Sequence, residues 1–427
     1  MTLQTTPPDL SLLPVSAADV DAAAERLEGV AVVTPLQRSQ RLSTRAGSDI
    51  WLKREDLQPV RSYKIRGAYN LIAQLSAEER ARGVICASAG NHGQGVAMAC
   101  ALLGVQARIH VPSTTPRQKR ERMTTLGGEY VELVVNGETY DDAYRSARIA
   151  AEREGFVMVP AFDDARTIAG QGTVAPEIVK QLGAAPDVVL VPVGGGGMLA
   201  GMLTWFAVHA PETRVIGVEP GGAICMQAAF DAGKPVVLRT IDTFVDGAAV
   251  RKAGELTYQI AAAHPDLELQ SVPEGRICVE MLDLYQVDGI IAEPAGALAS
   301  AAIGEWLPAP GQTVVAILSG GNNDVARYAE VIERALVYEG RKHYFLVNFP
   351  QEPGALRRFL DDVLGPNDDI TYFEYVKRSD RALGPALVGV ELGSSEDLPD
   401  LLRRIRRSRI EVEPIDPQSM MFRFMTP

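Results

Sequence analysis

Apolar and polar positions alternate on two scales between about residues 50 and 335. Short β-branched apolar runs are each followed by a longer stretch, rich in Ala and Leu, with helical spacing. These runs lie at residues 83–88, 107–112, 188–193, 214–219, 289–294 and 313–319. Continuous apolar runs are typical of parallel strands buried on both faces, and their alternation with helices predicts crossover units. The pattern therefore predicts an α/β fold built on open parallel sheets.

A different pattern begins at about residue 336. It predicts a strand at 343–349, a helix at 353–364, and two strands at 370–376 and 385–392. A second helix is predicted from the capping signal of Ser394 and Asp397 onward, and a last strand near 419–424. This is the order of a ferredoxin-like module. The chain is therefore predicted to have two domains, 1–337 and 338–427.

Three of the apolar runs in the first domain end in glycine-rich clusters that open directly into a helix. The clusters are SAGNHGQG at 88–95, GGGGMLAG at 194–201 and SGGNND at 319–324. Because ligands of open α/β sheets bind beyond the carboxyl ends of the strands, we expect the three clusters to share one site. Gly194 to Gly197 and the following helix N-terminus are suited to a phosphate, although a turn for close strand–helix packing would also need glycines.

The same glycines permit another interpretation. Residues 195–200 spell G-x-G-x-x-A, and Glu219 follows where a dinucleotide-binding fold places its ribose-binding acid. An NAD-dependent oxidoreductase is therefore an alternative, although it leaves the other two glycine clusters without a role.

Lys64 is the candidate for nucleophilic or basic chemistry. It lies in VRSYKIRGAYNL, between apolar neighbours and close to Arg61 and Arg66. Partial burial and nearby cations favour the neutral amine that such chemistry needs. The spacing alone does not distinguish it from an ordinary surface lysine.

Composition narrows the class of protein. The 427 residues carry a net charge of −12 with 46% hydrophobic residues, which excludes global disorder and offers no electrostatic footprint for nucleic acid. The basic run at 403–409 is expected on the solvated face of a helix. No apolar run approaches the ~20 residues of a membrane span, and the first residues resemble no secretory signal. Four scattered cysteines and five scattered histidines indicate no disulfide framework and no metal site, so a cytoplasmic protein is expected.

The motifs RSYKIRGA, SAGNHGQG, GGGGM and SGGN, in this order, resemble the threonine dehydratase branch of the pyridoxal-phosphate enzymes related to the tryptophan synthase β chain. DDARTIAGQGT at 163–173 and AEPAGA at 292–297 match the same family. The resemblance runs from about Thr34 to the C-terminus. It implies pyridoxal 5'-phosphate as cofactor and a two-lobed catalytic domain, with a smaller lobe at roughly 80–165.

The resemblance also implies roles for individual residues. Lys64 would form the Schiff base with the cofactor and later remove the substrate α-proton. The cofactor phosphate would lie against Gly194, Gly195, Gly196, Gly197 and Met198. Asn91 would bind the ring hydroxyl and Ser319 the pyridine nitrogen, while Ser88, Ala89, Asn91 and His92 would face the substrate carboxylate. Ser88 and His92 could instead cap the following helix.

The implied reaction is β-elimination from L-threonine, giving 2-oxobutanoate and ammonia, the first step of isoleucine biosynthesis. Because the hydroxyl of Ser319 is neutral, we hypothesise that the ring nitrogen stays unprotonated and that elimination is favoured over transamination. Glu293 has two interpretations, a loop acid beside Pro294 or a group that acts near the cofactor.

NFPQEPGALRRFL at 348–360 resembles the start of the ACT-like regulatory domain of biosynthetic threonine dehydratases. The resemblance implies inhibition by isoleucine, opposed by valine, in a homo-oligomer, a dimer or a tetramer. A pure dimerisation module, and a catabolic serine/threonine dehydratase or racemase of the same fold, remain alternatives.

Overall fold

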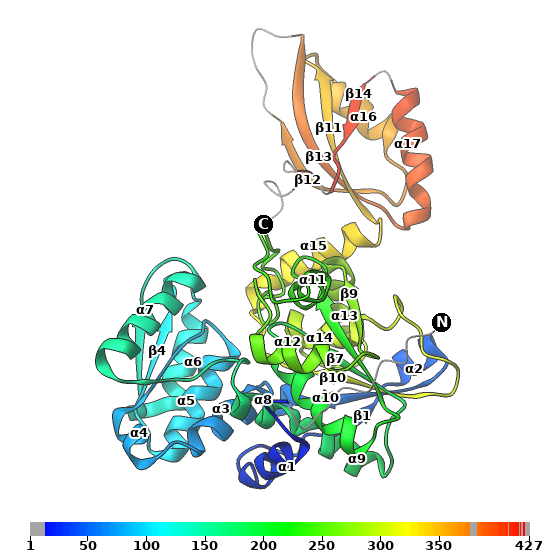
Figure 1. The fold of residues 1–427 in the computed structure, drawn as a ribbon. Helices are drawn as coiled ribbons and strands as arrows, with labels where there is room; N and C mark the ends of the chain where they lie inside the picture. Colours follow the sequence, from blue (N-terminus) through cyan, green and yellow to red (C-terminus); the bar gives the residue numbers. More distant parts are fainter. Residues whose placement is uncertain (1–12, 376–381, 409, 418, 420–421, 423–427) are drawn as a thin grey trace. The chain divides into compact units, whose positions relative to one another are not determined.

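The computed structural model describes residues 13–375, 382–408, 410–417, 419 and 422, and these fall into two compact units (Figure 1). The first unit comprises residues 1–274 and 283–323. The second comprises residues 275–282 and 324–427. Each unit has its own sheet or sheets and its own apolar core.

The larger lobe of the first unit is built on a six-stranded sheet of order β1-β2-β10-β7-β8-β9. Only β1 runs antiparallel to its neighbour. The strands are β1 (Leu36–Arg38), β2 (Asp49–Arg54), β7 (Val188–Pro192), β8 (Arg214–Pro220), β9 (Glu268–Val272) and β10 (Thr313–Leu318). The side chains of β7 are all buried, as the continuous apolar run predicts. The predicted α/β fold with parallel sheets is confirmed.

The smaller lobe of the first unit has an all-parallel sheet of order β5-β4-β3-β6. Its strands are β3 (Val84–Ala87), β4 (Ala107–Val111), β5 (Val131–Val135) and β6 (Val157–Met158). Figure 1 shows α7 on the outer side of this sheet and α5 and α6 on the other side. The helices of this lobe are α4 (Ala77–Arg82), α5 (Asn91–Leu103), α6 (Arg117–Gly127) and α7 (Tyr140–Glu154).

The first unit contains further helices, of which α3 (Lys64–Ala73) packs against α5 and joins the apolar core of the smaller lobe. They are α1 (Ala17–Arg26), α2 (Gln40–Ala46), α3 (Lys64–Ala73), α8 (Ala165–Gly172), α9 (Val174–Leu182), α10 (Gly197–His209), α11 (Cys225–Ala232), α12 (Glu255–Ala262) and α14 (Pro294–Ala301). Helix α13 (Glu274–Gln286) contributes residues 275–282 to the second unit.

Helix α8 lies between α3 and α10 and meets both through glycines (Figure 1). A Cβ added at Gly170 of α8 would come within 2.5 Å of the Arg66 carbonyl of α3. On the other side, a Cβ at Gly201 of α10 would come within 2.3 Å of the Ile168 carbonyl of α8. At these glycines the backbone of α8 therefore approaches the backbones of α3 and α10 directly. We call this arrangement the glycine stack.

The strand predicted at 289–294 does not form. Gly289, three residues after the end of α13, adopts a left-handed conformation with φ 67°, and Pro294 is the first residue of α14. The Glu293 N–H donates to the Gly320 carbonyl, outside any strand ladder. Because β2 and β7 already flank β10, the sheet has no free edge beside that strand. A short apolar run between two helix signals was therefore wrongly interpreted.

The second unit contains η4 (Val325–Arg327), α15 (Tyr328–Tyr338) and a four-stranded antiparallel sheet of order β12-β13-β11-β14. Its further elements are β11 (Lys342–Pro350), α16 (Ala355–Val363), β12 (Asp369–Tyr375), β13 (Leu383–Glu391), η5 (Ser395–Asp397), α17 (Leu398–Arg407) and β14 (Glu411–Pro414). Ser394 and Asp397 form the predicted capping box. The predicted β-α-β-β-α-β order is confirmed.

The last strand of this module differs from its prediction. The fourth strand is β14, whereas most of the predicted strand at 419–424 lies outside the described residues. The basic run does belong to α17, where Leu401 and Ile405 are buried and Arg403 and Arg406 are exposed.

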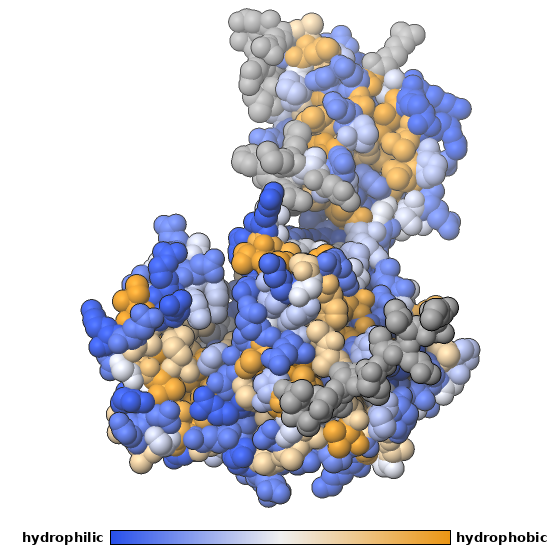
Figure 2. All heavy atoms as spheres, in the orientation of Figure 1, coloured by the Kyte–Doolittle hydropathy of each residue, from blue (hydrophilic) through white to orange (hydrophobic). Residues whose placement is uncertain are grey.

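Figure 2 shows polar side chains over most of the visible face of each unit, with apolar residues in small groups. None of the helices in the described part of the chain combines the length and apolar character that crossing a bilayer requires.

Candidate active site

Lys64 is the first residue of α3, and the chain before it is attached to the SGGN cluster after β10. Ser62 pairs with Gly320 in an isolated β-bridge, and the Tyr63 N–H donates to the Ser319 carbonyl at 3.2 Å. The Lys64 ammonium donates to the Ala161 carbonyl at 3.1 Å. The structure thus brings Lys64 and Ser319, 255 positions apart in the sequence, to adjacent places.

A buried network of ion pairs holds helix α3 in place. The Arg66 guanidinium is almost fully buried and bonds to both Glu55, at 2.8 Å, and Glu177, at 2.7 Å. Burial alone would raise the pKa of Glu55, but Arg66 and Lys53 hold it below its ordinary value. The charge of Arg66 is therefore matched within the core. This position does not support the expectation that Arg66 acts on Lys64.

Gly194 to Gly197 form the turn between β7 and α10, as predicted. Gly196 has φ 94°, which favours glycine. A Cβ at Gly195 would lie 2.4 Å from three ring atoms of Phe162, and one at Gly197 would lie 2.4 Å from the Gln171 Oε1 atom. The Thr257 hydroxyl donates to the Gly195 carbonyl at 2.6 Å. The turn is thus fixed from two sides, and side chains larger than hydrogen are excluded from it.

Gln171 connects this turn to the lysine. Its amide nitrogen donates to the Ala161 carbonyl at 2.9 Å, the same oxygen that accepts from Lys64. The Gln171 Oε1 atom and the Ser62 hydroxyl are buried and have no hydrogen-bond partner among the described residues. Buried polar atoms are normally bonded, so unpaired ones beside the lysine and the glycine turn indicate a polar ligand there.

Met198 is the last residue of the predicted cradle. Its side chain is only 1% exposed and belongs to the core of the larger lobe. Its main-chain N–H, in the first turn of α10, is therefore the group that it can offer to an anion.

The SAGNHGQG cluster forms the junction between β3 and α5, but its capping differs from the alternative proposed from the sequence. Gly90 is the N-cap of α5 and makes no side-chain cap bond. The Ser88 hydroxyl instead accepts from the Gly90 N–H at 3.2 Å. Ala89 is half-buried beside it. Neither Ser88 nor His92 caps the helix.

His92 is buried and its ring is oriented by a main-chain carbonyl. Nε2 lies 2.8 Å from the Val159 carbonyl oxygen, which can only accept, so Nε2 carries the hydrogen. Burial and the charge of Lys64 lower the pKa of His92 to about 4, which makes the ring neutral at pH 7. Nδ1 therefore presents a lone pair and is unsuited to donate to a carboxylate.

Asn91, at the start of α5, joins the glycine clusters on both lobes. Its Nδ2 donates to the Glu293 Oε1 atom at 2.5 Å, and its Oδ1 accepts from the Asn322 amide at 2.7 Å. Burial and the Asp246 charge raise the pKa of Glu293 to about 7, with Lys119 and Asn91 opposing. Close by, the Ser319 hydroxyl donates to the Ala295 carbonyl at 3.0 Å.

Glu219 does not have the geometry of a ribose-binding acid. Its carboxylate is buried and accepts from the N–H groups of Met226, at 2.7 Å, and Gln227, at 2.9 Å, in the first turn of α11. Both carboxylate oxygens therefore accept hydrogen bonds within the protein. Glu219 is not free to bind a ribose hydroxyl, as the dinucleotide-binding interpretation requires.

Phe162, Gln171 and Asn322 were not singled out as site residues from the sequence. DDARTIAGQGT contains Gln171, and Asp163 of the same motif accepts from the Glu255 and Leu256 N–H groups of α12. This motif could have pointed to Gln171, but its sequence alone does not reveal which of its side chains contacts the glycine turn.

Two known protein families match this chain. The family described as pyridoxal-phosphate dependent enzyme matches residues 27–320, and the C-terminal regulatory domain of threonine dehydratase matches residues 333–425. The chain is 58% identical over 424 residues to L-threonine dehydratase biosynthetic IlvA of Mycobacterium tuberculosis (strain ATCC 25618 / H37Rv), with 99% of each chain covered.

Solved structures of related enzymes resemble this chain in sequence and in fold. The processed form of threonine deaminase isoform 2 from Solanum lycopersicum is 38% identical, with TM-score 0.71, over 79% of this chain and 94% of that chain. Serine racemase from Dictyostelium discoideum is 30% identical, with TM-score 0.67, over 73% of this chain and 100% of that chain.

Proposed function

The chain belongs to the pyridoxal-phosphate-dependent enzymes, in the family of the biosynthetic threonine dehydratases, and we propose from this premise that it converts L-threonine to 2-oxobutanoate and ammonia. The observation that carries the proposal is the convergence of Lys64, the glycine turn and the SGGN cluster through Ala161, Gln171 and the Ser62–Gly320 bridge. Elimination from threonine in this way is the entry to isoleucine biosynthesis.

The residues present fit pyridoxal 5'-phosphate. The turn at 194–197 and the N-terminus of α10 offer main-chain N–H groups for the phosphate. Lys64 would hold the aldehyde carbon, Asn91 the ring oxygen and Ser319 the ring nitrogen. The side-chain oxygens of Gln171 and Ser62, which have no partner among the described residues, can form further hydrogen bonds in the same site. When bound, the cofactor supplies an electron sink for the carbanion that forms at the substrate α-carbon.

Lys64 is proposed to move the proton. Once released from the cofactor, its neutral amine could take the α-proton, and the Ala161 carbonyl is placed to accept a hydrogen bond from that nitrogen. Arg66 fixes α3 and thus the position of its first residue. Accurate placement of the base is worth several orders of magnitude in rate, so a rigid α3 serves the reaction directly.

The substrate carboxylate is proposed to bind at the start of α5, against Ser88, Ala89, Asn91 and His92. The main-chain N–H groups of this helix end suit a carboxylate. Because the His92 Nδ1 atom is an acceptor, His92 would contribute its main chain, or its ring to a hydroxyl or ammonium donor of the substrate.

Residues 338–427, which make up most of the second unit, are proposed as an ACT-like regulatory domain, with the catalytic domain at 1–337 and its smaller lobe at roughly 80–165. Isoleucine is the proposed inhibitor and valine the proposed antagonist, acting in a homo-oligomer. The match of residues 333–425 to a threonine dehydratase regulatory domain supports this. The four buried free thiols support a cytoplasmic location.

The deciding experiment incubates purified protein with L-threonine, with and without isoleucine, and follows 2-oxo acid formation. We expect formation of 2-oxobutanoate that isoleucine suppresses and that valine restores. Activity only on serine, or inversion of serine without ammonia release, would favour the dehydratase or racemase alternatives. A colourless protein that shows no borohydride-sensitive absorption would overturn the cofactor role of Lys64.

A further inference from the structure

The amide of Asn91 is held in one orientation by a directed chain of hydrogen bonds. The chain begins at the Val60 carbonyl, which can only accept and which receives one hydrogen of the Asn322 amide at 2.8 Å. The other hydrogen of that amide goes to the Asn91 oxygen at 2.7 Å. Asn91 must therefore turn its NH₂ group away from Asn322, toward Glu293, which accepts one hydrogen at 2.5 Å. A main-chain carbonyl thus sets the direction of the entire chain.

The Asn91–Glu293 contact is enclosed so that it cannot move far. A Cβ at Gly320 would lie 2.2 Å from the Glu293 Oε1 atom and 3.2 Å from the Asn91 Nδ2 atom. A Cβ at Gly247 would lie 3.6 Å and 4.0 Å from the same two atoms. Glu293 itself is 5% exposed, and its N–H donates to the Gly320 carbonyl. The absence of a side chain at Gly320 is what lets the carboxyl group reach the amide.

One hydrogen of the Asn91 amide is left over. The amide nitrogen carries two, and within the described chain only Glu293 takes one of them. Asn91 is half-buried, whereas Glu293 and Ser319 beside it are buried. The remaining N–H is therefore directed by Glu293 and Asn322 rather than free to rotate or flip.

We propose that Glu293 is a positioning residue, which with Asn322 fixes the Asn91 amide so that its remaining N–H is presented to the ring oxygen of the cofactor. The proposal rests on the assignment of Asn91 to that oxygen in the proposed function. Glu293 acts through Asn91 and takes no proton in the reaction. Asn322 acts from the opposite end of the same chain.

The test is a double-mutant cycle on the full-length protein, with pyridoxal 5'-phosphate titrated into the apoenzyme and the bound absorption spectrum recorded. We expect Glu293→Ala to raise the cofactor dissociation constant about ten-fold and to shift the absorption band. Glu293→Gln, whose side-chain oxygen can still accept from Asn91, should remain within about three-fold of wild type. In an Asn91→Ala background, Glu293→Ala should add less than two-fold, because its target is gone.

Controls separate the possible failures. Glu212→Ala, at an exposed glutamate on the turn before β8, should change neither affinity nor spectrum. If Glu293→Ala fails to fold by circular dichroism, Asn322→Ala tests the same chain and should give the same spectral shift. Additive effects of Glu293→Ala and Asn91→Ala, or a wild-type spectrum and affinity in Glu293→Ala, would overturn the positioning role. Failure of the wild-type protein to bind the cofactor would instead overturn the proposed function.

Discussion

The ring of Phe162 lies directly against Gly195, in the space that a β-carbon at residue 195 would occupy. Phe162 comes from the segment before α8, and Gly195 from the turn between β7 and α10. The contact ties the segment that carries Ala161, the acceptor of Lys64, to the proposed phosphate site.

Gly195→Ala should therefore raise the dissociation constant for pyridoxal 5'-phosphate at least ten-fold, because the new methyl group meets three ring atoms at 2.4 Å. Absorbance titration of the apoenzyme measures this. Phe162→Ala in the same chain should recover part of the loss by making room. The matched control is Gly221→Ala, where the nearest atom would lie at 3.4 Å and φ is not positive. Equal effects at the two glycines would count against the role of the turn.

Lys64→Ala should lower kcat for threonine by about 10³-fold or more, since the variant lacks both the covalent anchor and the base. Mass spectrometry after borohydride treatment should find the cofactor attached to residue 64 in the wild type and to no residue in the variant. Lys180→Ala, at an exposed position on α9, is the control and should behave as wild type. Retained borohydride labelling in Lys64→Ala would show that another lysine holds the cofactor.

Ser319→Asp tests why elimination is favoured. A carboxylate against the ring nitrogen would keep it protonated, so we expect the pyridoxamine form of the cofactor to accumulate during turnover, with a lower kcat for elimination. The site is only 3% exposed and faces the Ala295 carbonyl, so cofactor affinity should also fall. Ser319→Ala controls for loss of the hydroxyl alone. If the Asp variant forms no transamination product, the hypothesis about the neutral hydroxyl is wrong.

Glu219→Gln should change how stability depends on pH. Burial raises the pKa of Glu219 to about 7 in the folded chain, against 4.5 for the ordinary group. The folded state therefore holds this proton more tightly, and wild-type stability falls as pH rises from about 4.5 to about 7, by about 3 kcal/mol for this one group. The melting temperature of the variant apoenzyme, relative to wild type, should accordingly rise between pH 5 and pH 8. A pH-independent offset between variant and wild type would contradict the assignment.

Deletion of the residues after Tyr338 should leave a threonine dehydratase that isoleucine no longer inhibits. The cut belongs after α15, because a Cβ at Gly275 of α13 would lie 2.4 Å from the Tyr338 Cβ atom, so the two helices are in contact. Initial rates with and without isoleucine give the answer. Inhibition that persists in a folded, active truncation would place the effector site in the first domain.

Much of the fold was readable because it depends on local chemistry. Buried strands such as Val188–Pro192 are continuous apolar runs, and the Ser394 capping box is a signal contained within four residues. The run at 289–294 has the same apolar character, and only the position of β10 between β2 and β7 shows that no strand can form there. Local pattern does not contain that information.

The site shows the same division. Lys64 and the glycine turn belong to compact motifs, whereas the contact between Asn91 and Glu293 joins positions 202 apart. Glu219 had the spacing of a ribose-binding acid, yet its hydrogen bonds to α11 are made seven and eight residues away. Spacing identifies candidate residues, and three-dimensional neighbours decide what each of them does.

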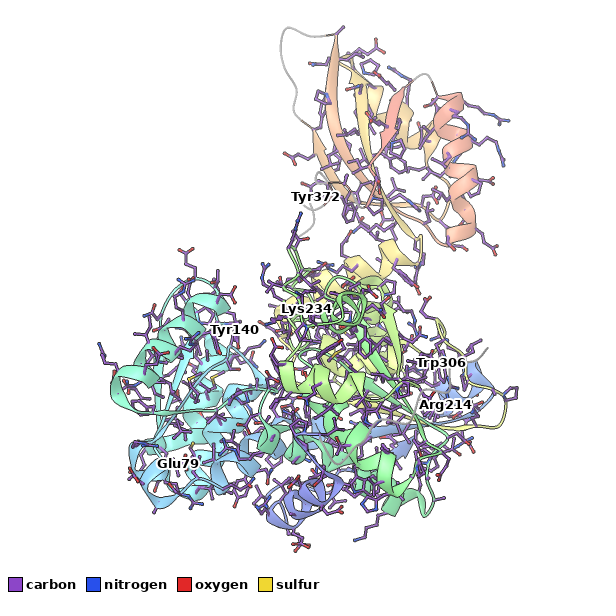
Figure 3. All side chains as sticks on the ribbon, in the orientation of Figure 1. Glu79, Tyr140, Arg214, Lys234, Trp306 and Tyr372 are labelled. Atoms are coloured by element: carbon purple, nitrogen blue, oxygen red, sulfur yellow. The ribbon has the colours of Figure 1, made fainter. Side chains whose placement is uncertain are left out.

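Figure 3 shows side chains filling both lobes of the first unit, with Glu79 and Tyr140 on the smaller lobe and Arg214 on the larger. The glycine stack is different, because the backbone of α8 directly approaches those of α3 and α10 there. Lys64 is the first residue of α3, and the phosphate turn leads into α10. Helix α8, which contacts both helices, therefore connects the two ends of the proposed cofactor site. For enzyme engineering, this means that a side chain added at Gly170 or Gly201 would disturb both ends of the cofactor site at once.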